Sequence, residues 1–104
     1  MSISTRSFLA VDNLSRDELL YLIEYSIRLK EQTSAGVCPQ FFKGKMTGLV
    51  FHKPSLRTRI SFETGVHQLG GGTIFITDQE IQLGVRESIA DAARVLSRYL
   101  NVIV

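Results

Sequence analysis

Hydroxyl and guanidinium side chains are concentrated in one short segment, residues 53–59 (KPSLRTR). Ser55 and Thr58 carry hydroxyls that can donate hydrogen bonds. Arg57 and Arg59 carry planar guanidinium groups, whose shape and charge match the oxygens of a phosphate. The combination of neutral and charged donors indicates an anion-binding site, with phosphate as the best-matched ligand.

The segment lies between a predicted strand and a predicted helix. Residues 46–51 (MTGLVF) are apolar and partly β-branched, which is typical of a buried parallel strand. Near-helical spacing follows at Ile60, Phe62, Val66 and Leu69. Ser55 therefore lies close to a helix start, where unpaired backbone N–H groups and the helix dipole favour an anion. The alternative is an ordinary helix that Ser55 merely caps, with both arginines solvated.

Further helices and strands are predicted on both sides of this segment. Residues 15–18 have the capping-box pattern and start an amphipathic helix that extends to about Gln32. Glycines at 70–72 allow a tight reversal before a second buried strand at 73–76. Ser88 with Asp91 caps a third helix, and residues 101–104 (NVIV) predict a third buried strand.

The alternation of these elements predicts the fold class. It is α/β in the order αβαβαβ, with a parallel sheet, right-handed crossovers and flanking helices. Ligands of such sheets bind beyond the carboxyl ends of the strands. Residues 55–58 follow the first strand and residues 77–86 follow the second, so both should lie along one edge and form one site. Residues 77–87 are long for such a connection, which indicates a functional loop or contact surface, the alternative being plain surface.

Composition excludes several other classes of protein. The 104 residues include 12 Lys and Arg against 10 Asp and Glu, without the basic stripe and interleaved aromatics of a nucleic-acid surface. There is neither an apolar signal segment nor a run of eighteen apolar residues, so we expect no membrane partner. Cys38 is the single cysteine and has no metal-ligand pattern beside it, which indicates a reducing, cytoplasmic setting and no metal.

Two separated motifs resemble a known enzyme family. Residues 51–63 (FHKPSLRTRISFE) resemble the carbamoyl-phosphate signature of the aspartate and ornithine carbamoyltransferases. The usual form has Thr at the position of Leu56, and this departure removes a hydroxyl but keeps the backbone N–H. Residues 81–84 (IQLG) and 87–99 (ESIADAARVLSRY) are similar to the ornithine branch in particular. The resemblance covers essentially the whole chain and implies that residues 1–104 are a truncated N-terminal carbamoyl-phosphate-binding domain, with the C-terminal amino-acid-binding domain absent.

The resemblance also implies a reaction. The side-chain amine of L-ornithine attacks the carbonyl carbon of carbamoyl phosphate, which gives citrulline and phosphate in arginine biosynthesis, a part of amino-acid metabolism. Arg57 is the expected catalytic residue, because it would bind phosphate and neutralise charge in the transition state. The residues implied to bind carbamoyl phosphate are Ser55, Leu56, Arg57, Thr58 and Gln82. Gln82 would act in the neighbouring subunit of a homotrimer, and no cofactor is implied because carbamoyl phosphate is already activated.

Several alternatives stay open. Residues 83–86 (LGVR) lack the Lys of the aspartate branch, which favours ornithine, but Arg86 is a possible substitute, so aspartate or another amine remains an alternative substrate. A non-catalytic anion-binding module is a second alternative. Arg59 is four residues before Glu63 and could pair with it instead of binding phosphate. We expect the chain alone to be inactive and prone to association through uncovered surfaces.

Overall fold

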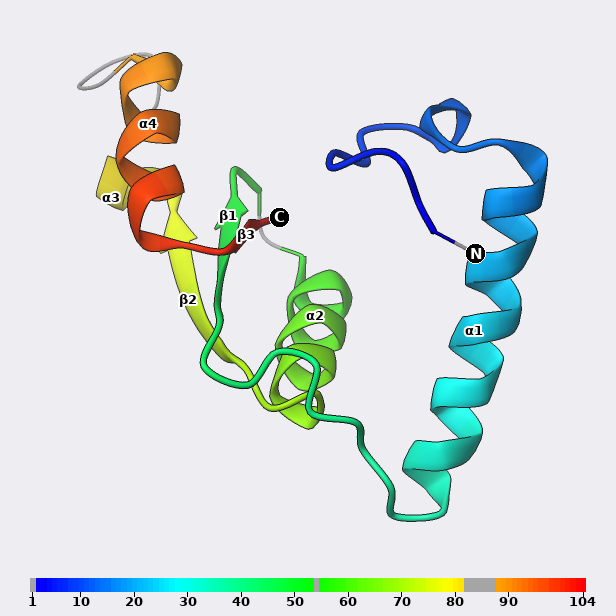
Figure 1. Cartoon of the computed structure of the whole chain (residues 1–104). Helices are drawn as coiled ribbons and strands as arrows, with labels where there is room; N and C mark the ends of the chain where they lie inside the picture. Colours follow the sequence, from blue (N-terminus) through cyan, green and yellow to red (C-terminus); the bar gives the residue numbers. More distant parts are fainter. Residues whose placement is uncertain (1, 54, 82–87) are drawn as a thin grey trace. The chain divides into compact units, whose positions relative to one another are not determined.

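The computed structural model describes residues 2–53, 55–81 and 88–104 of the chain (Figure 1). The chain divides into two compact units, Met1–Cys38 and Pro39–Val104, which are described separately below. All the helices in the described ranges are too short or too polar to span a membrane.

The first unit consists of a short 3₁₀ helix η1 (Val11–Asn13) and the long helix α1 (Arg16–Ser34). The predicted capping box at the start of α1 is confirmed. Glu18 N–H donates to Ser15 Oγ at 3.1 Å, and Ser15 N–H donates back to Glu18 Oε1 at 2.9 Å. The helix ends two residues later than the predicted Gln32. Gly36 follows with φ of +83°, a left-handed conformation that glycine adopts without a Cβ clash.

The second unit is built on three parallel strands. They are β1 (Met46–Phe51), β2 (Gly72–Thr77) and β3 (Val102–Ile103), and β1 lies between the other two. The first two strands pair along their whole length, from Met46 opposite Gly72 to Phe51 opposite Thr77. The predicted parallel sheet is therefore confirmed.

The expectation that residues 101–104 form a buried strand is wrong in one respect. The strand exists and pairs with β1, but Val102 and Ile103 keep 38% and 43% of their surface exposed. These side chains stay exposed because β3 is a two-residue strand at the edge of the sheet, with a neighbouring strand on one side only.

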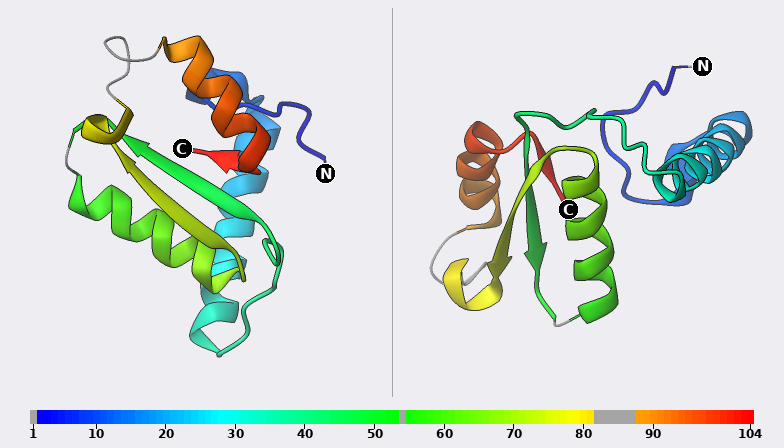
Figure 2. Two further views of the ribbon diagram at one scale, coloured as in Figure 1. Left: turned by 90° about the vertical axis from the view of Figure 1, so that its left-hand side faces the viewer. Right: turned by 90° about the horizontal axis from the view of Figure 1, so that it is seen from below.

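Helices lie on both faces of this sheet (Figure 2). Helix α2 (Leu56–Gln68) connects β1 to β2, and α4 (Ile89–Tyr99) lies between β2 and β3. The two connections run in opposite directions across the sheet, so right-handed crossovers place their helices on opposite faces. The predicted third helix is confirmed, and Ser88 Oγ accepts from Asp91 N–H at 3.1 Å. The four-residue helix α3 (Asp78–Ile81) was not predicted.

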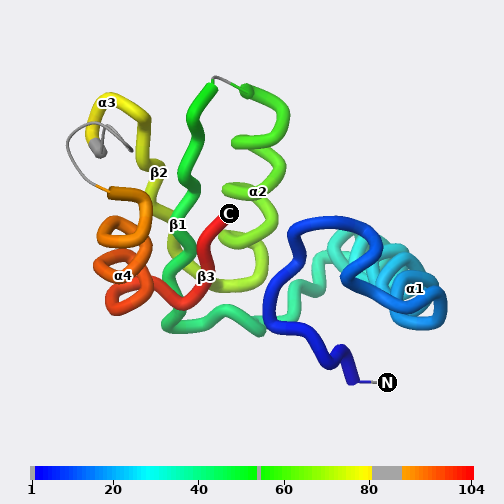
Figure 3. The backbone as a smooth tube through the Cα atoms, turned by 90° about the horizontal axis from the view of Figure 1, so that it is seen from above, coloured from blue at the N-terminus to red at the C-terminus, as the bar shows by residue number. Residues whose placement is uncertain are grey.

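The core of the second unit is small. Leu49, in the middle of β1, has no exposed surface, and Val66, Ile76 and Ala92 are also buried. Leu100, the residue after α4, packs so closely against β1 that a Cβ at Gly48 would meet its Cδ1 atom. Glycine at this position therefore lets the connection after α4 pass directly over the central strand. The tube view in Figure 3 shows β1 between α4 and α2.

Candidate functional site

The carboxyl ends of β1 and β2 lie side by side, as the sequence predicts. Phe51 ends β1 opposite Thr77, which ends β2. The chain leaves β1 toward α2 and leaves β2 into α3, so residues 51–53, 55–56 and 77–79 approach the same edge of the sheet. The predicted placement of both segments along one edge of the sheet is therefore confirmed for these residues. Gln82 lies outside the described part of the chain.

The start of α2 differs from the starts of α1 and α4. Ser55 is its N-cap residue by backbone conformation, but its hydroxyl accepts no bond from the helix N–H groups that the structure describes. Instead, Ser55 Oγ donates to Thr58 Oγ1 at 2.9 Å. The first helical bond runs from Arg59 N–H to Ser55 O at 3.0 Å. The three preceding N–H groups therefore point out of the helix start without a side-chain cap, which is the arrangement that favours an anion.

The two arginines near this helix start have different surroundings. Arg57 is exposed. Arg59 Nε donates to Glu63 Oε1 at 2.9 Å, and the Arg59 Cζ atom lies 3.8 Å from the centroid of the Phe75 ring. The predicted pairing of Arg59 with Glu63 is thus confirmed. Arg57 forms no ion pair with the residues that the structure describes, so its guanidinium can bind an anion.

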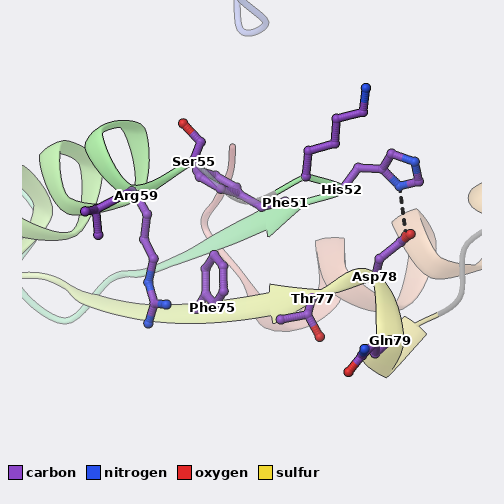
Figure 4. Close-up of a pocket in the computed structure, with 10 residues that line it drawn as sticks. Phe51, His52, Ser55, Arg59, Phe75, Thr77, Asp78 and Gln79 are labelled. Carbon is purple, nitrogen blue, oxygen red and sulfur yellow. Dashed lines mark ion pairs between the residues drawn. The ribbon is translucent and has the colours of Figure 1, made fainter.

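A pocket of about 610 Å³ opens at this edge of the sheet (Figure 4). Its lining includes Ser55 and Leu56, which the sequence analysis assigned to the site. It also includes Arg59, for which the sequence left two roles open, phosphate binding or pairing with Glu63. In the described part of the chain, neither Arg57 nor Thr58 belongs to the lining. Of the residues that the sequence assigned to the site, Ser55 and Leu56 therefore line the pocket, and Arg57 does not.

The pocket also contains residues that the sequence did not single out for the site. Phe51 and Phe75 form one wall, with ring centroids 5.5 Å apart and an edge-to-face angle of 72°. His52 Nδ1 lies 3.0 Å from Asp78 Oδ1, and this pair joins the end of β1 to the start of α3. Both contacts depend on strand register. The sequence placed Phe51 and His52 in the 51–63 motif and Asp78 in the 77–87 segment, but it gave no signal for the contacts of Phe75.

The donor set of the site is suited to an anion. Backbone N–H groups, two hydroxyls and nearby Lys53 and Arg57 provide hydrogen bonds and positive charge. Within residues 2–53, 55–81 and 88–104 there is no group of three His, Cys, Asp or Glu side chains that could hold a metal ion. The arrangement can therefore bind phosphate through the helix start.

A parallel α/β domain with an uncapped helix start at the carboxyl ends of its strands has the arrangement that phosphate-binding domains use. Comparison with known proteins defines the family within this class. Residues 6–104 match the model of the aspartate/ornithine carbamoyltransferase family, carbamoyl-P binding domain. The chain belongs to this family, as its resemblance predicts.

Individual relatives agree with this assignment. The chain is 46% identical over 99 residues to the ornithine carbamoyltransferase of Caldicellulosiruptor saccharolyticus, covering 95% of this chain and 32% of that protein. It is 49% identical over 96 residues to that of Oceanobacillus iheyensis, covering 92% and 30%. The chain thus spans about one third of the length of these curated relatives.

Solved structures from both branches share the fold. The ornithine carbamoyltransferase of Pyrococcus furiosus matches with a TM-score of 0.93 at 36% identity, covering 99% of this chain and 33% of that one. The catalytic subunit of M. jannaschii aspartate transcarbamoylase matches with a TM-score of 0.84 at 30% identity, covering 95% and 33%. The fold alone therefore does not separate the two branches.

Proposed function

We propose that this chain is the carbamoyl-phosphate-binding part of an ornithine carbamoyltransferase. The observation that carries the proposal is the uncapped start of α2, with Ser55 and Thr58 beside it, in a chain that belongs to this family. Ornithine is favoured over aspartate because the curated relatives above are ornithine carbamoyltransferases. The complete reaction needs an amino-acid-binding half, and this chain supplies the phosphate half.

The proposed reaction transfers a carbamoyl group between two nucleophiles. The neutral side-chain amine of ornithine forms a bond to the carbonyl carbon, and the bond from that carbon to the phosphate oxygen breaks. Phosphate leaves with the bonding electron pair, and the nitrogen loses one proton as citrulline forms. Negative charge develops first on the carbonyl oxygen and then on the leaving phosphate, so fixed donors near both atoms lower the barrier.

Each residue of the 55–58 turn has a proposed role in this reaction. The backbone N–H groups of Leu56, Arg57 and Thr58 bind phosphate oxygens, and Leu56 needs no hydroxyl for this task. The Ser55 and Thr58 hydroxyls, already 2.9 Å apart, orient the phosphate. The Arg57 guanidinium binds the phosphate and offsets the charge that grows on it. Arg57 is accordingly the proposed catalytic residue.

The assembly is part of the same proposal. We infer that the complete protein is a cytoplasmic homotrimer acting in arginine biosynthesis, and that Gln82 of one subunit contributes to the phosphate site of its neighbour. The support is the family membership together with the loop resemblance at residues 81–84. A Gln82→Ala variant with weaker phosphate binding in the trimer, but unchanged trimer mass, would agree with this arrangement.

The binding proposal is tested by calorimetric titration of the folded chain with carbamoyl phosphate, and with phosphate as the stable control. We expect saturable binding that weakens about tenfold or more in Arg57→Ala, because hydrogen bonds to charged groups contribute about 1.5–3 kcal/mol. Arg98→Ala, which removes an exposed positive charge from α4, is the matched control and should bind like the wild type. Equal affinity of the Arg57 and Arg98 variants would reject the role of Arg57.

The substrate proposal is tested on the natural protein that carries this chain together with its amino-acid-binding half. We expect phosphate release from carbamoyl phosphate in the presence of ornithine and much less in the presence of aspartate. The reverse preference would assign the protein to the aspartate branch. Phosphate binding without transfer to any amine would favour the non-catalytic module.

A further inference from the structure

Arg59 joins the 55–58 turn to both paired strands without belonging to the proposed phosphate ligands. Its backbone N–H closes the first turn of α2 on Ser55 O at 3.0 Å. Its guanidinium is held by Glu63 Oε1 at 2.9 Å on one side and lies over the Phe75 ring of β2 on the other. The Phe75 ring in turn contacts Phe51, the last residue of β1, at 5.5 Å between centroids.

These contacts form a continuous chain of side chains, which we call the arginine stack: Glu63, Arg59, Phe75 and Phe51. Three of the four, all except Glu63, line the pocket beside Ser55. Figure 4 shows the Arg59 side chain extending from α2 toward Phe75, whereas the Ser55 side chain points elsewhere. The stack therefore contacts the site from the β2 side and does not occupy the helix start itself.

The contacts within the arginine stack favour one fixed position of the Arg59 guanidinium. A guanidinium over an aromatic face is attracted by the negative charge of the ring face, and its planar shape allows close stacking. Arg59 is 45% exposed and Glu63 is 30% exposed, so their ion pair is only partly screened by solvent. Glu63 holds one edge of the guanidinium and Phe75 faces its plane, so the Arg59–Phe75 contact connects α2 to β2.

We propose that Arg59 is a positioning residue: the arginine stack holds the first turn of α2 against β1 and β2, and so orients the donors of residues 55–58 toward the phosphate. This inference rests on the proposed function. It assigns Arg59 an indirect role, distinct from the direct contact of Arg57. It also assigns a role to Glu63, an acidic residue that an anion site would otherwise not favour.

Glu63 gives the sharpest test, because a pure charge effect and the arginine stack predict opposite changes in phosphate affinity when this residue is replaced. On charge alone, Glu63→Gln removes a negative charge near an anion site and should tighten phosphate binding. If the arginine stack orients the site, the same variant should weaken phosphate binding by about threefold or more, since Arg59 loses its partner. The matched control is Asp91→Asn, which breaks the exposed Asp91–Arg94 pair (2.7 Å) on α4 and should leave phosphate affinity unchanged.

Arg59 variants test the same inference from the other side of the pair. We expect Arg59→Ala to weaken phosphate binding about tenfold and Arg59→Lys to restore part of it, since Lys keeps the charge but loses the planar stacking. Arg59→Ala and Arg57→Ala should combine to less than the product of their separate effects, because a disoriented turn already impairs Arg57. Phosphate affinity at wild-type level in both Glu63→Gln and Arg59→Lys would overturn the inference.

A measurement without ligand separates this inference from the proposed function. Amide hydrogen exchange of residues 60–62, in the early turns of α2, should become about fivefold faster or more in Glu63→Gln, while exchange in β1 stays unchanged. A wild-type chain that fails to bind phosphate, but whose α2 exchange still responds to Glu63→Gln, would count against phosphate binding by the 55–58 turn alone and would leave the arginine stack intact. Unchanged α2 exchange in Glu63→Gln and Arg59→Lys would reject the arginine stack as the element that orders this turn, whatever binds there.

Discussion

Gly71, immediately before β2, is enclosed by atoms that include the backbone. A Cβ at this position would lie 2.9 Å from both Phe42 Cβ and Val66 Cγ1, and 3.2 Å from the backbone oxygen of Lys45. The backbone oxygen cannot move aside as a flexible side chain can. We therefore expect Gly71→Ala to lower the free energy of unfolding by about 1–3 kcal/mol, measured by urea denaturation followed by circular dichroism.

Gly65 provides the matched glycine in the same unit. It lies within α2, and a Cβ there would meet no atom of the described chain within 4 Å. Because glycine costs a helix interior about 0.5–1 kcal/mol relative to alanine, Gly65→Ala should raise the free energy of unfolding by about that amount. Destabilisation by Gly65→Ala would mean that this part of α2 needs the flexibility of glycine.

At the scale of the element, α1 is stabilised at its start by one carboxylate. Glu18 accepts hydrogen bonds from Ser15 N–H at 2.9 Å and from Ser4 N–H at 3.2 Å. The bond from the Ser15 backbone, followed by that from Ser4, lowers the pKa of Glu18 below its usual 4.5. A lowered pKa means that the folded state prefers the charged carboxylate, so the contribution is fully present above pH 4.5 and is lost as pH falls through the lower folded value.

The Glu18 carboxylate predicts that the helical signals of the wild type and of Glu18→Gln differ by an amount that depends on pH. At pH 7 we expect Glu18→Gln to reduce the helical signal of α1, because the neutral amide is a weaker acceptor at the positive end of the helix. The difference from the wild type should shrink as pH falls below 4.5. Ser15→Ala is the companion variant, and it should cost about 1 kcal/mol at either pH because the hydroxyl does not titrate. Circular dichroism at several pH values checks both, and a Glu18→Gln difference that is constant with pH would contradict this account.

Local patterns predicted most of the elements, and tertiary contacts account for the rest. The bounds of β1 and the caps at Ser15 and Ser88 follow from apolar runs and capping chemistry, which act over a few residues. Helix α3 is only four residues long, too short for a helical period to appear in the sequence. The exposure of β3 depends on its place at the sheet edge, and strand order is not encoded within the strand itself.

The same distinction applies to the candidate site. The Arg59–Glu63 pair was predictable because residues four apart face each other on any helix. The stacking of Arg59 on Phe75 was not, because it needs the register of β1 against β2 and the placement of α2 on one particular face. The His52–Asp78 contact depends on the same register. Sequence therefore proposed where along the chain the candidate site lies, whereas strand register determined which side chains meet there.

At the scale of the whole molecule, the small core and exposed apolar surface decide how the chain behaves in solution. Only five apolar residues of the described chain are buried, whereas eighteen large apolar side chains are exposed. Burying apolar area is the main favourable contribution to folding, so we expect modest stability for the isolated chain. The exposed surface also favours self-association, in agreement with the expectation from the sequence.

Strand β3 is one of the two edges of the sheet, and a sheet edge offers a specific route to association. It lies at the sheet edge, with unpaired backbone groups on its outer side and a 43% exposed Ile103. A second copy could add a strand there, because an open edge provides a row of backbone donors and acceptors. We expect Ile103→Lys to lower the concentration-dependent rise in sedimentation coefficient, since a charged side chain at an edge opposes strand addition. Val95→Lys is the control, because Val95 is 54% exposed on α4 and provides no strand edge. Equal relief by both variants would show that apolar area in general drives association, whereas relief by Ile103→Lys alone would identify the β3 edge as the contact.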